Sequence, residues 1–457
     1  MKRYIGLFVL SSVLLLNVGF VHAADAPPPE NLATLVASAL ANNPELKSSQ
    51  ARWQMFRNRI ALSRSLDDPM LMLKIQNGII REPFNFSKDP MTQKVIGISQ
   101  QIPFWGKRDL KGELAEKEAE TYQWQLEERT LELRKMVAET YYQIYFTDKS
   151  LEIVDKNIRI FDDFITLTEI KYSVGQGAQQ DVFKAQVERS KMLDMRITLE
   201  QQRKSLQANL NALLSRSVDT PVGTIPDFEI KPLDLSPDTL RGVALANRPM
   251  IKSLNALIEK GKAGHKLAEK EYYPDFNVSF EYMQREPVGM EPGDDMYSVG
   301  VTFNLPVRLG RRQAMVAESS AEITMASEEL NSLKNSINAG ISDLLAQLER
   351  RRKLVELYKT GIILQAEQSL ESAAIGYRVN KVDFLTLLDN RITLFNYERE
   401  LYDSLADYQM KLAQLAAVIG SDLTPAMPVP AASPSNPTPQ PAPLIELEHT
   451  QHHTNQP

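Results

Sequence analysis

Two segments in the second half of the chain alternate between apolar and polar side chains. One is DFNVSFEYM, residues 275–283, and the other is MYSVGVTFNL, residues 296–305. The apolar positions are Phe276, Val278, Phe280, Tyr282, Tyr297, Val299, Val301, Phe303 and Leu305. A period of two predicts a β-strand with one apolar and one polar face. Each segment spans about 9 to 11 residues, which is the length a tilted strand needs to cross a hydrocarbon layer.

The first half contains a weaker version of this alternation, over residues 70–76 and 96–102. Its apolar positions are Leu71, Leu73, Ile75, Ile96, Ile98 and Ile102. Between the two strands of each half lies a polar segment with Pro and Gly that contains Arg-Glu-Pro. Such a composition is typical of an exposed loop. We therefore expect four strands, two in each half, with an exposed loop joining each pair.

A much longer segment with helical periodicity follows each pair of strands. No proline occurs between Gly106 and Tyr172, and apolar residues recur there at intervals of three, four or seven. This pattern predicts a helix about 100 Å long. Gly175 and Gly177 end it, and a second helix returns to about Leu214. Because the polar faces are dense in Glu, Lys and Arg, we expect a packed coiled coil rather than a membrane span.

The second half predicts the same hairpin. Its long helix is expected over residues 313–377, and its return helix is expected to end near Ile419. Asn380 stands at the turn, where the first half has Gly175. Asparagine tolerates the left-handed backbone that a tight turn requires, so the two turns can have the same geometry.

These elements belong to a unit that is written twice. ALANNPELKS at residues 39–48 recurs as ALANRPMIKS at residues 244–253, with seven of ten letters identical. Further matches follow in order at an offset near 205: Pro69 with Pro274, Gly97 with Gly300, Pro103 with Pro306, GKR at 106–108 with GRR at 310–312, and Tyr172 with Tyr377. Each unit is predicted to hold a helix, two strands and a long helical hairpin. Duplicated halves of this kind usually lie around a pseudo-symmetry axis.

The repeat divides the chain into five segments. Residues 1–23 combine a basic start, an apolar run and small residues at the end, which predicts a cleaved signal peptide rather than a membrane anchor. The first repeat covers residues 24–214, a Pro-containing linker covers 215–235, and the second repeat covers 236–423. The Pro-rich tail, residues 424–457, lacks the apolar content to fold and is predicted to be disordered.

Composition narrows the range of functions. The chain has no cysteine, which excludes disulfides, thiol nucleophiles and thiolate metal sites. Its formal net charge of −6 does not indicate nucleic-acid binding. No phosphate loop, HExxH or Gly-x-Ser-x-Gly occurs, so we expect neither an enzyme nor a cofactor. In the tail, His449, His452 and His453 offer at most a weak metal site.

Four two-faced strands cannot span a membrane alone, because the edges of an open sheet leave backbone amides unpaired in hydrocarbon. Other copies of the chain must close the sheet. Two copies would supply eight strands and three would supply twelve, and strand polarity alone does not choose between them. A soluble domain whose sheet has one solvated face is the alternative. The signal peptide and the long helices disfavour it.

Together these features resemble the TolC-like outer-membrane channels of tripartite efflux pumps and type I secretion systems. The resemblance rests on the duplicated Ala-Leu-Ala-Asn-x-Pro, on QIPFWGKR and NLPVRLGRR after the strands, and on the Tyr-x-Val turns before DVFKAQ and FLTLLDN. It extends to about residue 423. It implies a mainly α protein with a membrane β-barrel: a homotrimer whose twelve-stranded barrel is continuous with an α-helical barrel in the periplasm.

The resemblance also implies partners and a cargo class. The expected partners are a periplasmic adaptor protein, an inner-membrane pump of the RND type, and the lipid bilayer. The Phe-Trp-Gly-Lys-Arg segment looks like members that work with heavy-metal pumps, which favours metal cations over drugs, other organic solutes or type I secretion substrates. A soluble periplasmic coiled-coil adaptor or scaffold is the competing function, and it explains the long helices but not the strands.

In this family acidic side chains converge on the pore axis just after the second helical turn. The family pattern Val-Asp-Val-Leu-Asp matches LTLLD here, which places Asp389 at the second acidic position and Thr386 at the first. Three copies of Asp389 would form a negative ring that attracts cations. The alternative is an ordinary solvated carboxylate near a helix N-terminus.

Five other residues near the two turns are candidates. Asp383, Lys381 and Asp181 are expected to supply exposed charge or to cap helices. Tyr172 and Tyr377 could bridge neighbouring hairpins through their hydroxyl groups, and plain packing is the competing interpretation.

Overall fold

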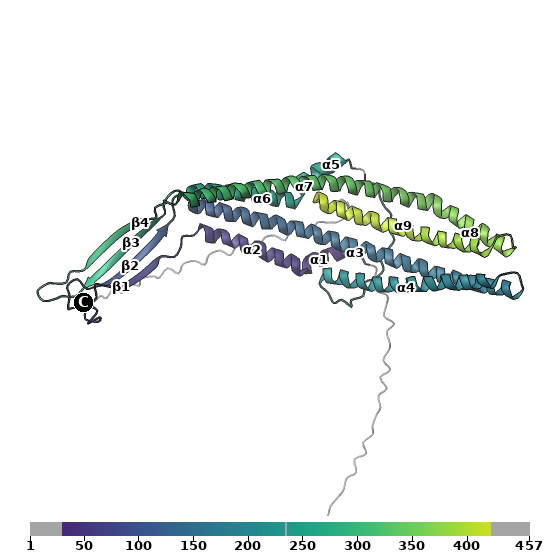
Figure 1. The fold of residues 1–457 in the computed structure, drawn as a ribbon, viewed down its shortest axis with the longest axis horizontal. Helices are drawn as coiled ribbons and strands as arrows, with labels where there is room; N and C mark the ends of the chain where they lie inside the picture. The colour runs from purple at the N-terminus through teal and green to yellow at the C-terminus, as the bar shows by residue number, and fades with distance from the viewer. Residues whose placement is uncertain (1–29, 234, 422–457) are drawn as a thin grey trace, which may run out of the picture. The chain divides into compact units, whose positions relative to one another are not determined.

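The computed structural model describes residues 30–233 and 235–421, which belong to one compact unit (Figure 1). The first half consists of α1 (Leu32–Asn42), α2 (Pro44–Arg64), β1 (Met70–Gln76), β2 (Gln93–Ile102), α3 (Lys107–Ser173) and α4 (Gln179–Leu214). The second half consists of α5 (Pro237–Asn247), α6 (Pro249–Lys270), β3 (Phe276–Arg285), β4 (Met296–Phe303), α7 (Leu309–Leu357), a π turn η1 (Tyr358–Ile362), α8 (Ile363–Arg378) and α9 (Phe384–Ile419).

Some expectations fall outside this range. The predicted signal peptide and the tail with its three histidines lie outside the described residues. Among the described helices, none combines the length and the apolar content that a membrane span requires.

The repeated phrase marks a break between two helices, where the sequence predicted one helix. Asn43 separates α1 from α2, and Pro44 is the first residue of α2. Arg248 and Pro249 play the same parts between α5 and α6. The prediction of a single helix was wrong because proline disfavours a helical conformation in the residue before it, yet fits the first position of a new helix.

The four strands form one antiparallel sheet in the order β1-β2-β3-β4, so the pair β2–β3 joins the two halves. In this pair Gly97 is opposite Glu281 and Ile102 is opposite Phe276. Together with the registers of the outer pairs, this places the alternating apolar residues of all four strands on one face. The strand prediction is therefore confirmed for the sheet within one chain. A slip of one residue would exchange the two faces.

The two glycines that the repeat aligns both lie on the polar face of the sheet. A Cβ atom on Gly97 would lie 3.0 Å from Cε of Met72 and 3.1 Å from Cγ of Glu281. A Cβ atom on Gly300 would lie 2.9 Å from Oγ of Ser279. Glycine at these positions leaves room on the polar face for the side chains of neighbouring strands.

The helix α3 is the centre of the helical region. Its 67 residues correspond to about 100 Å, and it contacts α2, α4, α6 and α9. One apolar cluster, which includes Phe161, Phe384 and Phe395, joins α3, α4, α8 and α9. A second cluster, which includes Leu330 and Leu415, joins α5, α6, α7 and α9. The predicted first hairpin is confirmed, including the end of its return helix at Leu214.

The second long helix differs from its prediction. It begins at Leu309 rather than Gln313, and a π turn at Tyr358–Ile362 separates α7 from α8. A π turn adds one residue to a helical turn without ending the helix, so apolar spacing alone does not detect it. The return helix α9 ends at Ile419, as predicted.

Candidate functional site

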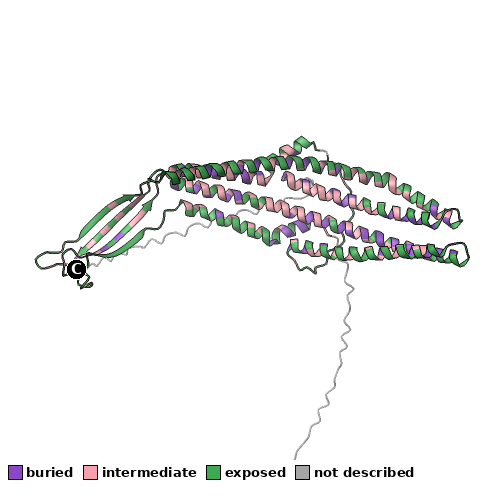
Figure 2. Cartoon of the chain, in the orientation of Figure 1, coloured by how far each residue is buried: buried purple, intermediate pink, exposed green. Residues whose placement is uncertain are grey.

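Both outer strands of the sheet have an edge that no described residue pairs. β1 pairs only with β2, and β4 pairs only with β3. Every residue of β1 is exposed, as is every residue of β4 except Gly300 (Figure 2). An unpaired edge presents free N–H and C=O groups to another strand. The sheet therefore has two edges that can accept strands.

The apolar face of the sheet is its more exposed face at the central strands. In β2, Ile96 and Ile98 are 53% and 50% exposed, whereas Val95 on the polar face is 2% exposed. The polar face carries one cross-strand ion pair, in which Lys74 Nζ lies 3.2 Å from Glu281 Oε2. A second pair links Lys94 to Glu286 at the loop end of the sheet, where the register places Lys94 on the same face as Ile96. A face that is apolar and exposed suits lipid contact, and a face with paired charges suits water.

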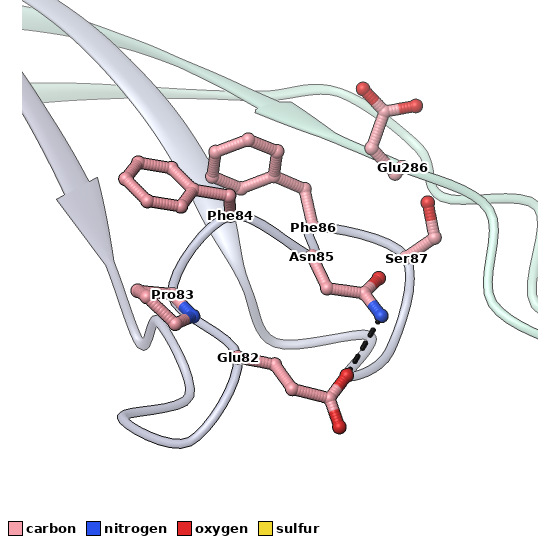
Figure 3. Close-up of a pocket in the computed structure, with 7 residues that line it drawn as sticks. All are labelled: Glu82, Pro83, Phe84, Asn85, Phe86, Ser87 and Glu286. Carbon is pink, nitrogen blue, oxygen red and sulfur yellow. Dashed lines mark hydrogen bonds between the residues drawn. The ribbon is translucent and has the colours of Figure 1, made fainter.

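The loops that join the strands form an open pocket of about 620 Å³ (Figure 3). It is lined by Glu82, Pro83, Phe84, Asn85, Phe86, Ser87 and Glu286. Glu82 is bound by Asn85 Nδ2 at 2.9 Å and by Lys88. Glu286 is bound by Lys94 Nζ at 2.6 Å. Since both carboxylates already have partners, the pocket offers little charge to select a ligand.

The two helical turns have the same backbone geometry. Gly175 has φ +72° and Asn380 has φ +58°, both in the left-handed region. In each turn an amide donates back to the carbonyl oxygen five residues earlier: Gln176 to Lys171 at 2.8 Å, and Lys381 to Gly376 at 2.8 Å. These bonds satisfy carbonyl groups at the end of a helix. The expectation that Asn380 replaces Gly175 is confirmed.

Lys171 joins the two turns, which the sequence pattern does not indicate. Its side chain is buried, and its Nζ donates to the carbonyl oxygens of Tyr377 at 2.5 Å and Arg378 at 3.5 Å, and to Asn380 Oδ1. It also lies 4.4 Å from the centre of the Tyr377 ring. A cation at the C-terminal end of a helix is favourable there. The equivalent of Lys171 in the second repeat is Gly376, which has no side chain to make the same contact. The contact therefore occurs once per chain.

The two candidate tyrosines have different surroundings. Tyr377 is buried against Phe384, with ring centres 5.7 Å apart. Its hydroxyl has no hydrogen-bond partner among the described residues, and burial raises the pKa of that hydroxyl. Tyr172 is about half exposed. Within the chain, the ring of Tyr377 packs against Phe384. A bridge from the hydroxyl group of Tyr172 or Tyr377 to another hairpin stays a prediction.

The charged candidates also lie at the turns. Asp383 caps α9, because its Oδ1 accepts a hydrogen bond from the amide of Thr386 at 2.8 Å. The hydrogen bonds from Thr386 hold the pKa of Asp383 below its usual value. Asp389, six residues further along α9, is exposed and makes no hydrogen bond or ion pair with the described residues. Lys381 is exposed in the turn, and Asp181 is half-buried in the first turn of α4.

Beyond the turn, a buried polar cluster links α3 to α9. Arg391 is buried, its Nε donates to Asn157 Oδ1 at 2.7 Å, and its guanidinium lies 3.3 Å from Glu398 Oε2. Burial lowers the pKa of Arg391. Glu398 also binds Lys156 at 2.8 Å. The sequence pattern does not indicate this cluster, because its members lie far apart in the chain.

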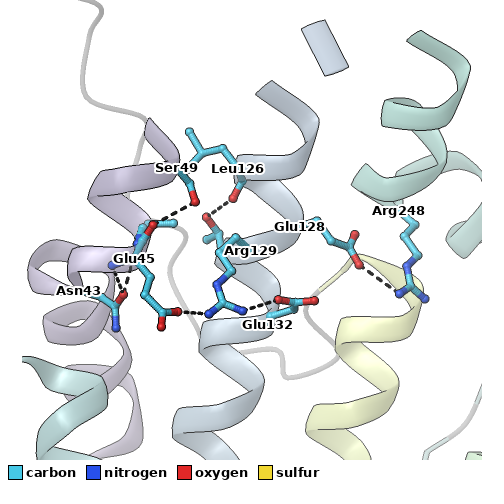
Figure 4. A network of polar contacts seen from close by, with 10 residues as sticks. Asn43, Glu45, Ser49, Leu126, Glu128, Arg129, Glu132 and Arg248 are labelled. Atoms are coloured by element: carbon cyan, nitrogen blue, oxygen red, sulfur yellow. Dashed lines mark hydrogen bonds and ion pairs between the residues drawn. The ribbon is translucent and has the colours of Figure 1, made fainter. Parts of the chain in front are cut away.

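The two helix breaks are capped in different ways (Figure 4). Asn43 Oδ1 accepts hydrogen bonds from two backbone amides in the first turn of α2, at 3.0 and 3.2 Å. At the second break the acceptor comes from α3, where Glu128 binds the amide of Met250 at 3.1 Å and the guanidinium of Arg248 at 3.0 Å. Asn43 and Arg248 also donate to carbonyl oxygens near the ends of α4 and α9. The first repeated segment thus binds the end of α4, and the second binds the end of α9.

A buried lysine lies where the strands meet the helices. Lys107, the first residue of α3, is only 1% exposed. Its Nζ lies 2.9 Å from Asp275 Oδ1 and 3.3 Å from Glu271 Oε2, and donates to the carbonyl oxygen of Tyr273 at 3.0 Å. A buried ammonium group requires such partners. We call these four residues the junction clasp. It joins the end of β2 to the start of β3.

The return helices α4 and α9 differ in what covers them, although each has 36 residues. Phe183 and Val187 on α4 are 55% and 53% exposed. Their equivalents at an offset of 205 are Leu388 and Ile392 on α9, which belong to the apolar cluster with α3. The positions that pack into this cluster on α9 are therefore exposed on α4.

The two halves also match known proteins. A family model described as outer membrane efflux protein matches residues 35–216 and 240–421. The chain belongs to this family. The resemblance inferred from the sequence is thereby confirmed, as are the location in the outer membrane with extension into the periplasm and the expectation of a passive exit duct rather than an enzyme. Proteins of this family form the outer-membrane component of tripartite efflux pumps.

Individual relatives are distant but cover most of the chain. The outer membrane efflux protein BepC of Brucella suis is 22% identical over 81% of this chain and 81% of its own length. The cobalt-zinc-cadmium resistance protein CzcC of Cupriavidus metallidurans is 21% identical over 82% of this chain and 86% of its own. The crystal structure of VceC from Vibrio cholerae matches with a TM-score of 0.73 at 17% identity, covering 86% of this chain and 97% of that one. This structural likeness confirms the mainly helical fold class.

Proposed function

We propose that three copies of this chain form one duct, in which a twelve-stranded barrel in the outer membrane continues into an α-helical barrel in the periplasm. One observation carries the proposal: the contact between the two repeats is made once inside the chain, and the surfaces that could make it again are exposed. Three four-stranded sheets give twelve strands, which leaves a wider lumen than eight. Two copies would give the narrower barrel.

The repeat predicts how β4 pairs with β1 of a second copy. Inside the chain Ile102 is opposite Phe276. Their repeat equivalents are Leu305 and Leu71, at offsets of 203 and 205 residues. We therefore place Leu305 opposite Leu71 of the partner subunit. This register keeps the apolar residues of both strands on one face, as a membrane barrel requires.

The helices of neighbouring copies should also meet as the two repeats do inside the chain. Within the chain α9 packs against α3, so α4 should pack against α8 of the partner subunit. The apolar residues that α4 offers for this contact are Phe183 and Val187, both more than half exposed. Burying this surface provides a hydrophobic driving force for assembly.

Cysteine cross-linking tests the ring directly, because the native chain has no cysteine. With the proposed register, Thr302 lies opposite Lys74 of the partner subunit on the polar face. The Thr302→Cys/Lys74→Cys variant should form covalent trimers on mild oxidation. The pairs Thr302→Cys/Met72→Cys and Thr302→Cys/Gln76→Cys, each shifted by two residues, serve as register controls. Absence of any intermolecular cross-link in purified protein would reject the closed ring.

We further propose that Asp389 from three copies forms the narrow negative ring at the periplasmic tip. Its exposure and its lack of partners among the described residues support this role. Since Thr386 occupies the other acidic position of the family, each subunit contributes one carboxylate. Asp389→Ala should lower the preference for cations in planar-bilayer recordings, whereas Thr386→Ala should not. Unchanged ion selectivity in Asp389→Ala would remove this residue from the constriction.

For the partners and the cargo, we propose a periplasmic adaptor, an inner-membrane pump of the RND type, and heavy-metal cations. The similarity to CzcC, named for resistance to cobalt, zinc and cadmium, supports this cargo. Organic solutes or type I secretion substrates are the second candidate. Deleting the gene should raise sensitivity to zinc, cobalt or cadmium salts more than sensitivity to organic antibiotics. The reverse pattern would favour the second candidate.

A further inference from the structure

We propose that Arg308 and Arg311 of each copy bind Asp67 and Asp68 of the partner subunit, which makes a second clasp at every joint between copies. The inference rests on the proposed trimer. The clasp is nevertheless a separate contact, because a trimer could form without it. Its partner is a second copy of this chain, recognised by opposite charge where strands meet helices.

The junction clasp inside the chain shows why charges meet at such a place. β2 and β3 are antiparallel neighbours, so the residues after β2 lie beside the residues before β3. Lys107 follows β2, and its two acidic partners, Glu271 and Asp275, precede β3. A cation after one strand thus reaches carboxylates before the next. The lysine is buried there, so the contact excludes water from the joint.

The repeat places equivalent segments at the joint between copies. The GKR of residues 106–108 recurs as GRR at residues 310–312, after β4, so Arg311 is the equivalent of Lys107. The proline before β3, Pro274, recurs as Pro69 before β1. Two aspartates, Asp67 and Asp68, come directly before Pro69. When β4 of one copy pairs with β1 of the next, a basic and an acidic segment meet.

The four side chains have no partner in the part of the chain that the structure describes. Arg308, Arg311, Asp67 and Asp68 are all exposed, and none makes a side-chain hydrogen bond or ion pair with the described residues. The neighbouring Arg312, in contrast, donates to a carbonyl oxygen of the junction clasp at 2.6 Å. Two unpaired positive charges therefore lie beyond β4, and two unpaired negative charges lie before β1, at opposite edges of one sheet.

The proposed register brings these charges together. If Leu305 lies opposite Leu71 of the partner subunit, then Arg308, three residues later, lies opposite Asp68 of the partner subunit, because the strands are antiparallel. Arg311 follows one turn into the adjoining helix. Guanidinium and carboxylate groups form paired hydrogen bonds. The charges of the two arginines and the two aspartates add up to zero. The proposal is based on this match: two arginines after β4 meet two aspartates before β1 of the partner subunit, with opposite charge and in equal number.

Charge exchange tests the clasp in purified full-length protein in detergent. Asp67→Lys/Asp68→Lys places only positive charge at each joint, and should raise the monomer-to-trimer ratio about tenfold. Arg308→Glu/Arg311→Glu should have a similar effect. The variant with all four substitutions should restore the native ratio. Arg108→Glu changes an exposed arginine at the junction of β2 and α3, inside the sheet rather than at its edge, and should leave the ratio unchanged.

The outcomes separate this inference from the trimer itself. Recovery in the fourfold variant supports the clasp. If the arginine variant weakens the trimer and the aspartate variant does not, the arginines bind another anion, such as a phospholipid headgroup, and the clasp is overturned. If no reversal has an effect while the Thr302→Cys/Lys74→Cys cross-link still forms, the trimer stands and the clasp does not exist.

A milder variant covers the case in which charge reversal prevents folding. Asp67→Asn/Asp68→Asn removes the negative charges without adding positive ones. Exposed ion pairs weaken as salt rises, so the native trimer should lose stability between low and high salt, and this variant should lose less. An equal dependence on salt in both proteins would overturn the clasp.

Discussion

The Lys171→Met substitution should loosen the contact between the two helical turns. Methionine keeps the length of the side chain and its apolar stem but removes the ammonium group. The native Nζ binds the carbonyl oxygens of Tyr377 and Arg378 and the side chain of Asn380. No other described lysine binds these three groups. The variant therefore separates the polar link from the packing of the surrounding helices.

The expected loss can be estimated from these contacts. A hydrogen bond to a charged group contributes about 1.5–3 kcal/mol net, and a cation over an aromatic ring adds about 0.5–2 kcal/mol. The cost of burying the ammonium group, whose residue is 6% exposed, offsets part of this. A net loss of about 2 kcal/mol would shift the equilibrium between joined and separated turns about 30-fold.

Single-channel recordings in planar bilayers measure this shift. If the joined turns keep the tip narrow, Lys171→Met should open spontaneously up to about 30 times more often than the native channel. Lys381→Met is the matched control, because Lys381 is exposed in the same turn and its side chain makes no bond with the described residues. Native opening rates in folded, membrane-inserted Lys171→Met protein would refute the reasoning.

Two further predictions concern helix N-termini. Glu128→Ala should lower the free energy of unfolding by about 2 kcal/mol in urea titrations, because it removes both the cap on α6 and the partner of Arg248. Adding Arg248→Asn should recover about 1 kcal/mol, since asparagine caps the equivalent helix at Asn43; no recovery would contradict this view of the break. The cap from Asp383, whose folded pKa is lowered, should be present above the ordinary pKa of an aspartate and be lost as the pH falls through the lowered folded pKa. Hydrogen exchange in the first turn of α9 should show this loss, and Asp383→Asn, which caps without titrating, should not.

The sequence predicted those parts of the fold that depend on local chemistry. Strand positions followed from a period of two, and the ends of both return helices, at Leu214 and Ile419, were correct. The left-handed turn at Asn380 followed from its alignment with Gly175. In each case neighbouring residues decide the backbone conformation, so the information lies within a few positions of the chain.

The errors and omissions have a different origin. The break at Pro44 was visible in the repeated phrase, and the rule that proline begins rather than continues a helix would have found it. The contact of Lys171 with Tyr377 was not visible, because the two residues are 206 positions apart. The same holds for Arg391 and Asn157, which are 234 positions apart. Such pairs depend on how the helices pack, which one sequence without relatives does not reveal.

The equal length of α4 and α9 restricts how this protein can change. Deleting one residue from either helix would rotate everything beyond it by about 100° and shorten it by about 1.5 Å. In the proposed ring, where copies of the two helices alternate, a change in only one of them would leave every second turn misaligned. Viable insertions and deletions should therefore occur in both helices together, or be confined to the exposed loops between the strands.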